Sequence, residues 1–220
     1  MISELQKIVL LSLQVSGVAL IFSTLIGIPL GMFLGLKRFI GRKLLSALLF
    51  TGMGFPPVVI GLVVYTFLSR SGPLGQLNLP WLPTLFTPSA MMLAQTIIAF
   101  PLVAGFTMAA VMGVDPQLRL QVISLGATSR QASITVLMEA RIGVIVAVIA
   151  GFGRLIAEVG AVMLVGGNID GRTRVLTTAI VLETRRGNFE LALSLGAVLL
   201  TITFLANLAL MRLQGKNFDE

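Results

Sequence analysis

Two residues of opposite charge, Arg154 and Glu158, interrupt a run of otherwise apolar residues. On a continuous helix, side chains four positions apart share one face, where a guanidinium can pair with a carboxylate. An ion in the bilayer interior costs roughly 2.5–3.5 kcal/mol on insertion scales, so each residue needs a partner or a wet surrounding. The spacing allows two interpretations, a buried ion pair packed between helices or one face of a polar path across a membrane.

Hydroxyl groups follow this pair along the chain. The segment 166–190 carries Thr173, Thr177 and Thr178, and its four arginines exceed its three carboxylates by one charge. Neutral hydroxyls suit brief contact with an ion that must also leave, and a basic surplus attracts an anion or an acidic partner. We therefore expect Arg154, Glu158 and the three threonines to line a translocation path or gate.

The composition places these residues in a membrane. Hydrophobic residues make up 56% of the chain and charged residues 11%, and the mean hydropathy is +0.98. A soluble domain of 220 residues does not have this composition. Cys and His are both absent, which excludes disulfides, thiolate chemistry and imidazole metal sites. We expect no metal site and no catalytic residue. The net charge of +7 comes from Lys and Arg beside apolar runs, which orients a membrane protein and does not indicate nucleic-acid binding.

The sequence predicts an all-α, polytopic membrane domain that occupies the whole chain, residues 1–220. A helix of about 20 apolar residues crosses the hydrocarbon core. Five apolar runs reach that length, at residues 8–36, 44–68, 89–112, 142–165 and 189–211.

The basic residues orient these spans. The link 37–43, KRFIGRK, holds the densest basic cluster and is therefore expected in the cytoplasm. With five spans, the segments 113–141 and 212–220 are then also cytoplasmic, and the N-terminus lies outside. We expect a multi-pass membrane protein.

Two patterns concern helix packing. Pro56 and Pro57 follow two glycines in the second run and predict a kink or break there. Small residues recur at every fourth position of the first run and predict close approach of another helix. These residues are Ala19, Ser23, Gly27, Gly31 and Gly35.

The loop 113–141 has the signals of a helix, a glycine turn and a second helix. Asp115 and Pro116 fit the cap and first position of a helix, and Gly126 fits its end. Thr128 and Gln131 have the spacing of a capping box that starts the next helix.

This loop, VISLGATSRQASITVLMEAR, resembles the EAA loop of ABC importer permeases. In that family, a helix-glycine-helix docks on a separate ATPase, which implies an ATPase-coupling role for Leu120, Gln121, Val122, Gly126, Ala127 and Thr128. The chain departs from the pattern where Leu120 replaces the signature Glu, where Gln121 and Val122 replace two alanines, and where Met138-Glu139 replaces Leu-Pro.

Other segments are similar to permeases for sulfate, molybdate and tungstate. These segments are TGMGFPPVVIGLVVY and GFGRLIAEVGAVMLVGGNIDGRTRVLTTAI, and they look most like tungstate-uptake permeases. The resemblance implies a homodimer, a cytoplasmic ABC ATPase dimer that binds ATP and Mg, and an extracytoplasmic oxyanion-binding protein. It implies a prokaryotic plasma membrane and no cofactor on this chain, and it leaves molybdate or sulfate open as the transported ion.

The sequence is less consistent with two other classes of function than with a permease. An ion-coupled secondary carrier needs repeated halves and several intramembrane acids, whereas Glu158 is the one acid well inside a predicted span. A purely structural subunit does not account for the charged pair together with an organised loop. The chain has no GxxxxGK[ST] phosphate loop, so we expect a transport subunit that is not itself an enzyme.

Overall fold

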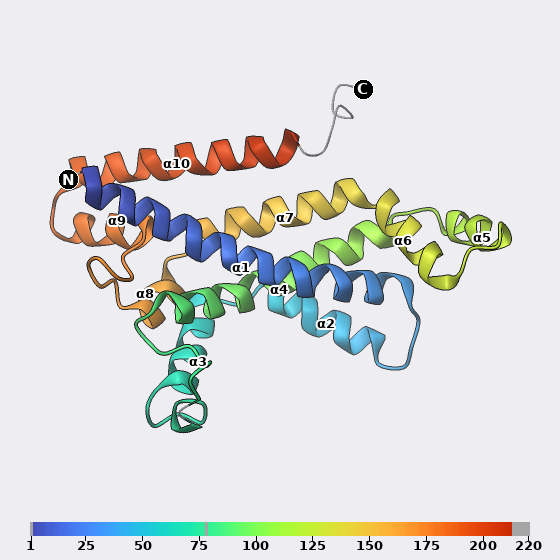
Figure 1. The fold of residues 1–220 in the computed structure, drawn as a ribbon, viewed down its shortest axis with the longest axis horizontal. Coiled ribbons are helices and arrows are strands. Elements are labelled where there is room, and N and C mark those ends of the chain that lie inside the picture. The colour runs from blue at the N-terminus through green and yellow to red at the C-terminus, as the bar shows by residue number, and fades with distance from the viewer. Residues whose placement is uncertain (1, 78, 213–220) are drawn as a thin grey trace.

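The computed structural model describes residues 2–77 and 79–212, which form an all-helical bundle without strands. The long helices run roughly along one axis, and shorter helices gather at the two ends (Figure 1). The α-helices are α1 Ile2–Leu36, α2 Arg42–Met53, α3 Pro57–Leu68, α4 Pro88–Met112, α5 Pro116–Ser124, α6 Ser129–Glu139, α7 Arg141–Ile156, α8 Gly160–Gly166, α9 Leu176–Arg185 and α10 Phe189–Arg212; a 3-10 turn, η1, covers Gly75–Leu77.

Helices α1 and α4 form the centre of the bundle. Glycines of α1 face α4 so closely that a Cβ at Gly31 would collide with the Ala104 carbonyl oxygen, and one at Gly35 would lie 2.7 Å from Val111 Cγ1. Ser23 is fully buried, and its hydroxyl donates to the Thr96 carbonyl of α4 at 3.2 Å. The small residues of the first run therefore form the contact surface that their spacing predicts.

Other helices surround this pair. Helix α7 packs on α4 and on α1, while α10 packs on α9 and α7. The N-terminal end of α1 lies beside α9 at one end of the bundle, and α5 and α6 project from the other (Figure 1). The loop 113–141 is thus far from the threonine-containing segment.

Three of the expected spans match single helices. Helices α1, α4 and α10 are each long and apolar enough to cross a membrane. Counting each of two bent helix pairs as one span raises the total from three to five. Of the C-terminal segment 212–220, only Arg212 lies within the described residues.

The run 44–68 is not a straight span. Helices α2 and α3 meet at an angle of 101°, with Pro56 before the first residue of α3 and Pro57 as that residue. Because proline lacks an N–H donor and fixes its own backbone, α2 cannot continue through this point. Helix α3 consequently leaves the bundle axis (Figure 1).

The expected single helix over 142–165 is wrong. Helix α7 ends at Ile156, residues 157–159 are not helical, and α8 begins at Gly160. At its other end, α7 meets α6 at 64°, so the second bent pair is α6 with α7. Arg154 and Glu158 therefore lie on either side of the end of α7.

Candidate functional site

The break between α7 and α8 centres on Glu158, which is only 5% exposed. Its Oε1 accepts a hydrogen bond from the Ala161 N–H at 3.0 Å, and its own N–H donates to the Leu155 carbonyl at 3.1 Å. The first turn of a helix has N–H groups without helical partners, and a carboxylate there satisfies one of them. Glu158 therefore ends one helix with its backbone and starts the next with its side chain.

Side chains from two other helices complete the hydrogen bonding at this break. The Gln95 amide of α4 donates from Nε2 to the Leu155 carbonyl at 3.1 Å. The Thr177 hydroxyl of α9 donates to the Glu158 carbonyl at 2.8 Å. Both side chains are buried, and irregular backbone at membrane depth is tolerated only where its polar groups are satisfied in this way.

The expected pairing of Arg154 with Glu158 is wrong. No ion pair within 4.0 Å joins these two described residues. Arg154 is exposed in the last turn of α7, whereas Glu158 is buried beyond the helix end. The i,i+4 argument assumed a continuous helix, and the chain leaves helical geometry between the two residues.

The hydroxyls of Thr173 and Thr178 both bond to the chain's own backbone. Thr173 Oγ1 donates to the Gly166 carbonyl and accepts from the Ile169 N–H, at 2.6 and 2.9 Å. Thr178 Oγ1 donates to the Val175 carbonyl at 3.0 Å and accepts from the Val175 N–H at 3.1 Å. Both residues are fully buried, so these hydroxyls shape the α8–α9 connection.

The structure thus divides the expected path residues into separate groups. It brings Glu158 and Thr177 into direct contact, places Thr173 and Thr178 in the adjoining connection, and leaves Arg154 on the surface of α7.

A small polar cavity adjoins the break, and most of its polar residues were missed from the sequence. Gln95 Oε1 is buried without a hydrogen-bond partner among the described residues. Ser12 Oγ accepts from the Leu176 N–H at 2.8 Å, so it also ties α1 to the start of α9. The available signal was Gln95, the one amide side chain in the apolar α4. The polar residues that line the cavity are Ser12, Ser16, Gln95, Glu158 and Thr177.

Charged side chains of the segment 166–190 pair with one another. Arg174 and Asp170 are 3.0 Å apart, and Arg186 and Glu183 are 2.9 Å apart. The Asn188 amide donates to Glu183 Oε2 at 2.8 Å. This hydrogen bond, together with the positive charge of Arg186, lowers the pKa of Glu183 despite the opposing effect of its burial. Two of the four arginines in this segment therefore already have carboxylate partners.

At the opposite end, the loop between α4 and α7 folds as its sequence predicts. The Asp115 carboxylate accepts from the Gln117 N–H at 2.9 Å at the start of α5. Thr128 and Gln131 form the expected capping box at the start of α6. Gly126 connects the two helices with φ of +93°, a left-handed conformation that glycine adopts without strain.

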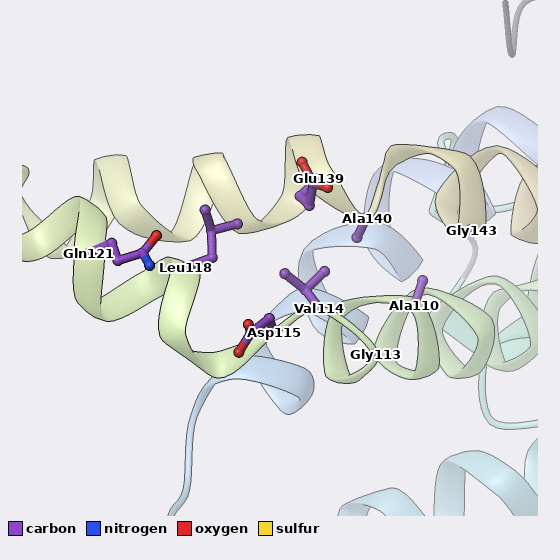
Figure 2. Close-up of a pocket in the computed structure, with 9 residues that line it drawn as sticks. All are labelled: Ala110, Gly113, Val114, Asp115, Leu118, Gln121, Glu139, Ala140 and Gly143. Carbon is purple, nitrogen blue, oxygen red and sulfur yellow. The ribbon is translucent and has the colours of Figure 1, made fainter. Parts of the chain in front are cut away.

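Apolar side chains are exposed along α5 and at the turn after it. Leu125 is 88% exposed and Leu120 63%, and with the exposed Ile123 they give this loop an apolar surface. Gln121, Gly126 and Thr128 are also exposed, while Val122 and Ala127 are half-buried. Figure 2 shows the groove beside this loop, between the end of α4, helix α5 and the corner where α6 meets α7.

The fold is that of an ABC importer permease. The methionine ABC transporter MetNI, in inward-facing conformations, contains a chain with a TM-score of 0.79 and 22% identity, matched over 97% of this chain and 95% of that chain. Residues 27–216 match the family described as binding-protein-dependent transport system inner membrane component, and the chain belongs to this family. It is a membrane-embedded transport subunit and not the ATPase of such a system.

Relatives with closer sequences are permeases as well. A probable anion ABC transporter permease of Haloferax volcanii is 43% identical over 94% of this chain and 89% of its own length. The tungstate uptake system permease TupB of Peptoclostridium acidaminophilum is 39% identical over 96% of this chain and 90% of its own length. The molybdenum transport system permease ModB of Escherichia coli K12 is 33% identical over 78% of this chain and 76% of its own length.

We predict that Thr177→Val destabilises the protein because the buried Glu158 carbonyl loses its donor. Leaving such a group unpaired costs about 1–3 kcal/mol. The purified permease should unfold at a lower temperature, and less of it should accumulate in membranes. Thr201→Val is the matched control, since the Thr201 hydroxyl is exposed and bonds only within α10. Equal melting temperatures for the two variants would contradict the role given to Thr177.

Proposed function

We propose that the chain is the permease of an ABC importer for a tetrahedral oxyanion, most closely tungstate. The observation that carries this proposal is the 39% identity to a tungstate uptake permease along 96% of the chain. Molybdate and sulfate are the alternative ions, because molybdenum and sulfate permeases also match, at 33% and 27% identity.

The path in this proposal runs along the exposed face of α7. Ile142, Val146 and Arg154 are exposed on that helix in the single chain, and Ala157 is exposed just beyond its end. An arginine facing lipid is costly, so Arg154 faces a wet path between this chain and a second copy. Its guanidinium offers paired N–H donors to an oxyanion. Glu158 and Thr177 hold the break beside this path, and Thr173 and Thr178 hold the connection that follows it.

The partners in this proposal meet opposite ends of the molecule. An ABC ATPase dimer, which binds ATP and Mg, receives the loop that includes Leu120, Gly126 and Thr128. An oxyanion-binding protein meets the end at which α9 and the start of α1 lie. The N-terminus is then outside the plasma membrane and the C-terminus is in the cytoplasm, as the basic link 37–43 favours.

We predict that Gly126→Ala weakens ATPase association and uptake while the permease still inserts. Gly126 has φ of +93°, a conformation that costs an L-residue roughly 1–2 kcal/mol. The alanine should therefore shift the α5–α6 turn. Gly113→Ala is the matched control, because Gly113 ends α4 at φ of −76° and a Cβ there meets only ordinary contacts. Co-purification of the ATPase measures the effect. Wild-type association in Gly126→Ala would contradict the docking role.

Uptake by the complete complex tests the proposed substrate. Proteoliposomes holding permease, ATPase and binding protein should accumulate tungstate, and excess sulfate should compete weakly. Arg154→Gln should reduce uptake at unchanged assembly, and Arg154→Lys should restore part of it, because the path keeps a cation. Arg212→Gln, which removes an exposed arginine at the end of α10, is the control. Preferred accumulation of sulfate would overturn the tungstate assignment, and normal uptake by Arg154→Gln would remove Arg154 from the path.

A further inference from the structure

Three arginines from separate elements line one groove at the α5 end of the bundle. Arg38 lies in the link between α1 and α2, Arg42 begins α2, and Arg119 lies in α5. The groove also has an apolar lining, in which Met112 and Leu120 are exposed whereas Val111 and Val136 are buried. Its apolar residues include Leu36, Val111, Met112, Val114, Leu120 and Val136.

The positive charge in this groove is not balanced within the described residues. None of the three arginines makes an ion pair there, and the one acidic lining residue, Asp115, caps α5 instead. Arg119 Nε is buried without a hydrogen-bond partner, although its Nη2 donates to Ser129 Oγ at 3.3 Å. Like charges held close together repel, so an anion that enters the groove is stabilised.

One of the three arginines also has a structural bond. Arg42 Nε donates to the Leu34 carbonyl at 2.7 Å, near the end of α1, and its Nη2 lies 3.4 Å from Met112 Sδ. Arg42 therefore joins the ends of α1 and α4 and fixes one wall of the groove. Arg38 and Arg119 remain to contact a ligand.

The position of the groove indicates a lipid. Leu36 and Met112 line it at the ends of α1 and α4, two helices that are long and apolar enough to cross a membrane. In the adjoining link, Ile40 is fully exposed and Phe39 is 36% exposed, between Arg38 and Arg42. Exposed apolar side chains flanked by cations are typical of a segment that lies in the headgroup layer.

We propose that this groove binds the phosphate of an anionic phospholipid, with the acyl chains beside the exposed Met112. The phosphate contacts Arg38 and Arg119 and lies beside Arg42. It therefore connects the α1–α2 link to α5, the first helix of the coupling loop. Lipid charge then affects how firmly α5 is held, a property separate from the choice of transported ion.

The test uses the permease–ATPase complex in nanodiscs of phosphatidylcholine, with or without phosphatidylglycerol. Phosphatidylglycerol should raise the melting temperature of the wild-type complex and should be retained in native mass spectrometry. Each arginine near a membrane surface contributes roughly five-fold to the affinity for anionic lipid, so Arg38→Gln/Arg119→Gln should bind phosphatidylglycerol about 25-fold more weakly. The control is Arg212→Gln, which removes an exposed arginine at the end of α10 and should keep the wild-type preference.

The other outcomes overturn the proposal in distinct ways. If Arg212→Gln lost as much phosphatidylglycerol binding as the double variant, general surface charge would be what attracts the lipid. Stabilisation by soluble phosphate in phosphatidylcholine nanodiscs, to the same extent, would identify a free-anion site. Loss of the ATPase from the double variant, with unchanged phosphatidylglycerol retention, would assign the arginines to the protein interface.

Discussion

Backbone hydrogen bonding at a broken membrane helix is the constraint on which the rest of this structure depends. The chain leaves helical geometry between Ile156 and Gly160, where water is not freely available to the exposed carbonyl and N–H groups. The Gln95 amide bonds to the Leu155 carbonyl, the Glu158 carboxylate to the Ala161 N–H and the Thr177 hydroxyl to the Glu158 carbonyl, so these backbone groups are paired. These bonds join α4, α8 and α9, so the break also determines where the chain goes next.

The same helices that pack the bundle also hold the break. Helix α4 packs directly against the glycines of α1 along one side and extends Gln95 toward the end of α7 on another. Helix α1 contributes Ser12, whose hydroxyl accepts from the first N–H of α9. Close packing of α1 on α4 therefore keeps two polar side chains at the positions that the break requires. A change in that packing is transmitted to the region that we assign to the path.

Local patterns made much of the fold predictable. Apolar runs of sufficient length gave the positions of α1, α4 and α10, and the signals at Asp115, Gly126 and Thr128 gave the helix-turn-helix loop. Each of these features depends on residues close together in the sequence. The break at Pro56 and Pro57 was predictable for the same reason, although its angle of 101° was not.

The candidate site was less predictable because its bonds join distant parts of the chain. Gln95 meets Leu155 sixty positions away, and Ser12 meets Leu176 across 164 positions. A helical spacing rule applied to Arg154 and Glu158 fails because α7 ends at Ile156, between the two residues, and the Glu158 carboxylate accepts from Ala161 of α8 instead. A buried carboxylate was correctly located, but its role is to accept a backbone hydrogen bond.

Comparison of Glu158→Gln with Glu158→Ala tests this role most directly, measured as the melting temperature of the assembled complex and its oxyanion uptake. Glutamine keeps a side-chain oxygen that accepts from the Ala161 N–H, whereas alanine removes it. Our account predicts near wild-type stability and uptake for Glu158→Gln and a clear loss for Glu158→Ala. Equal damage from both substitutions would show that the charge of Glu158 is what matters and would contradict the account.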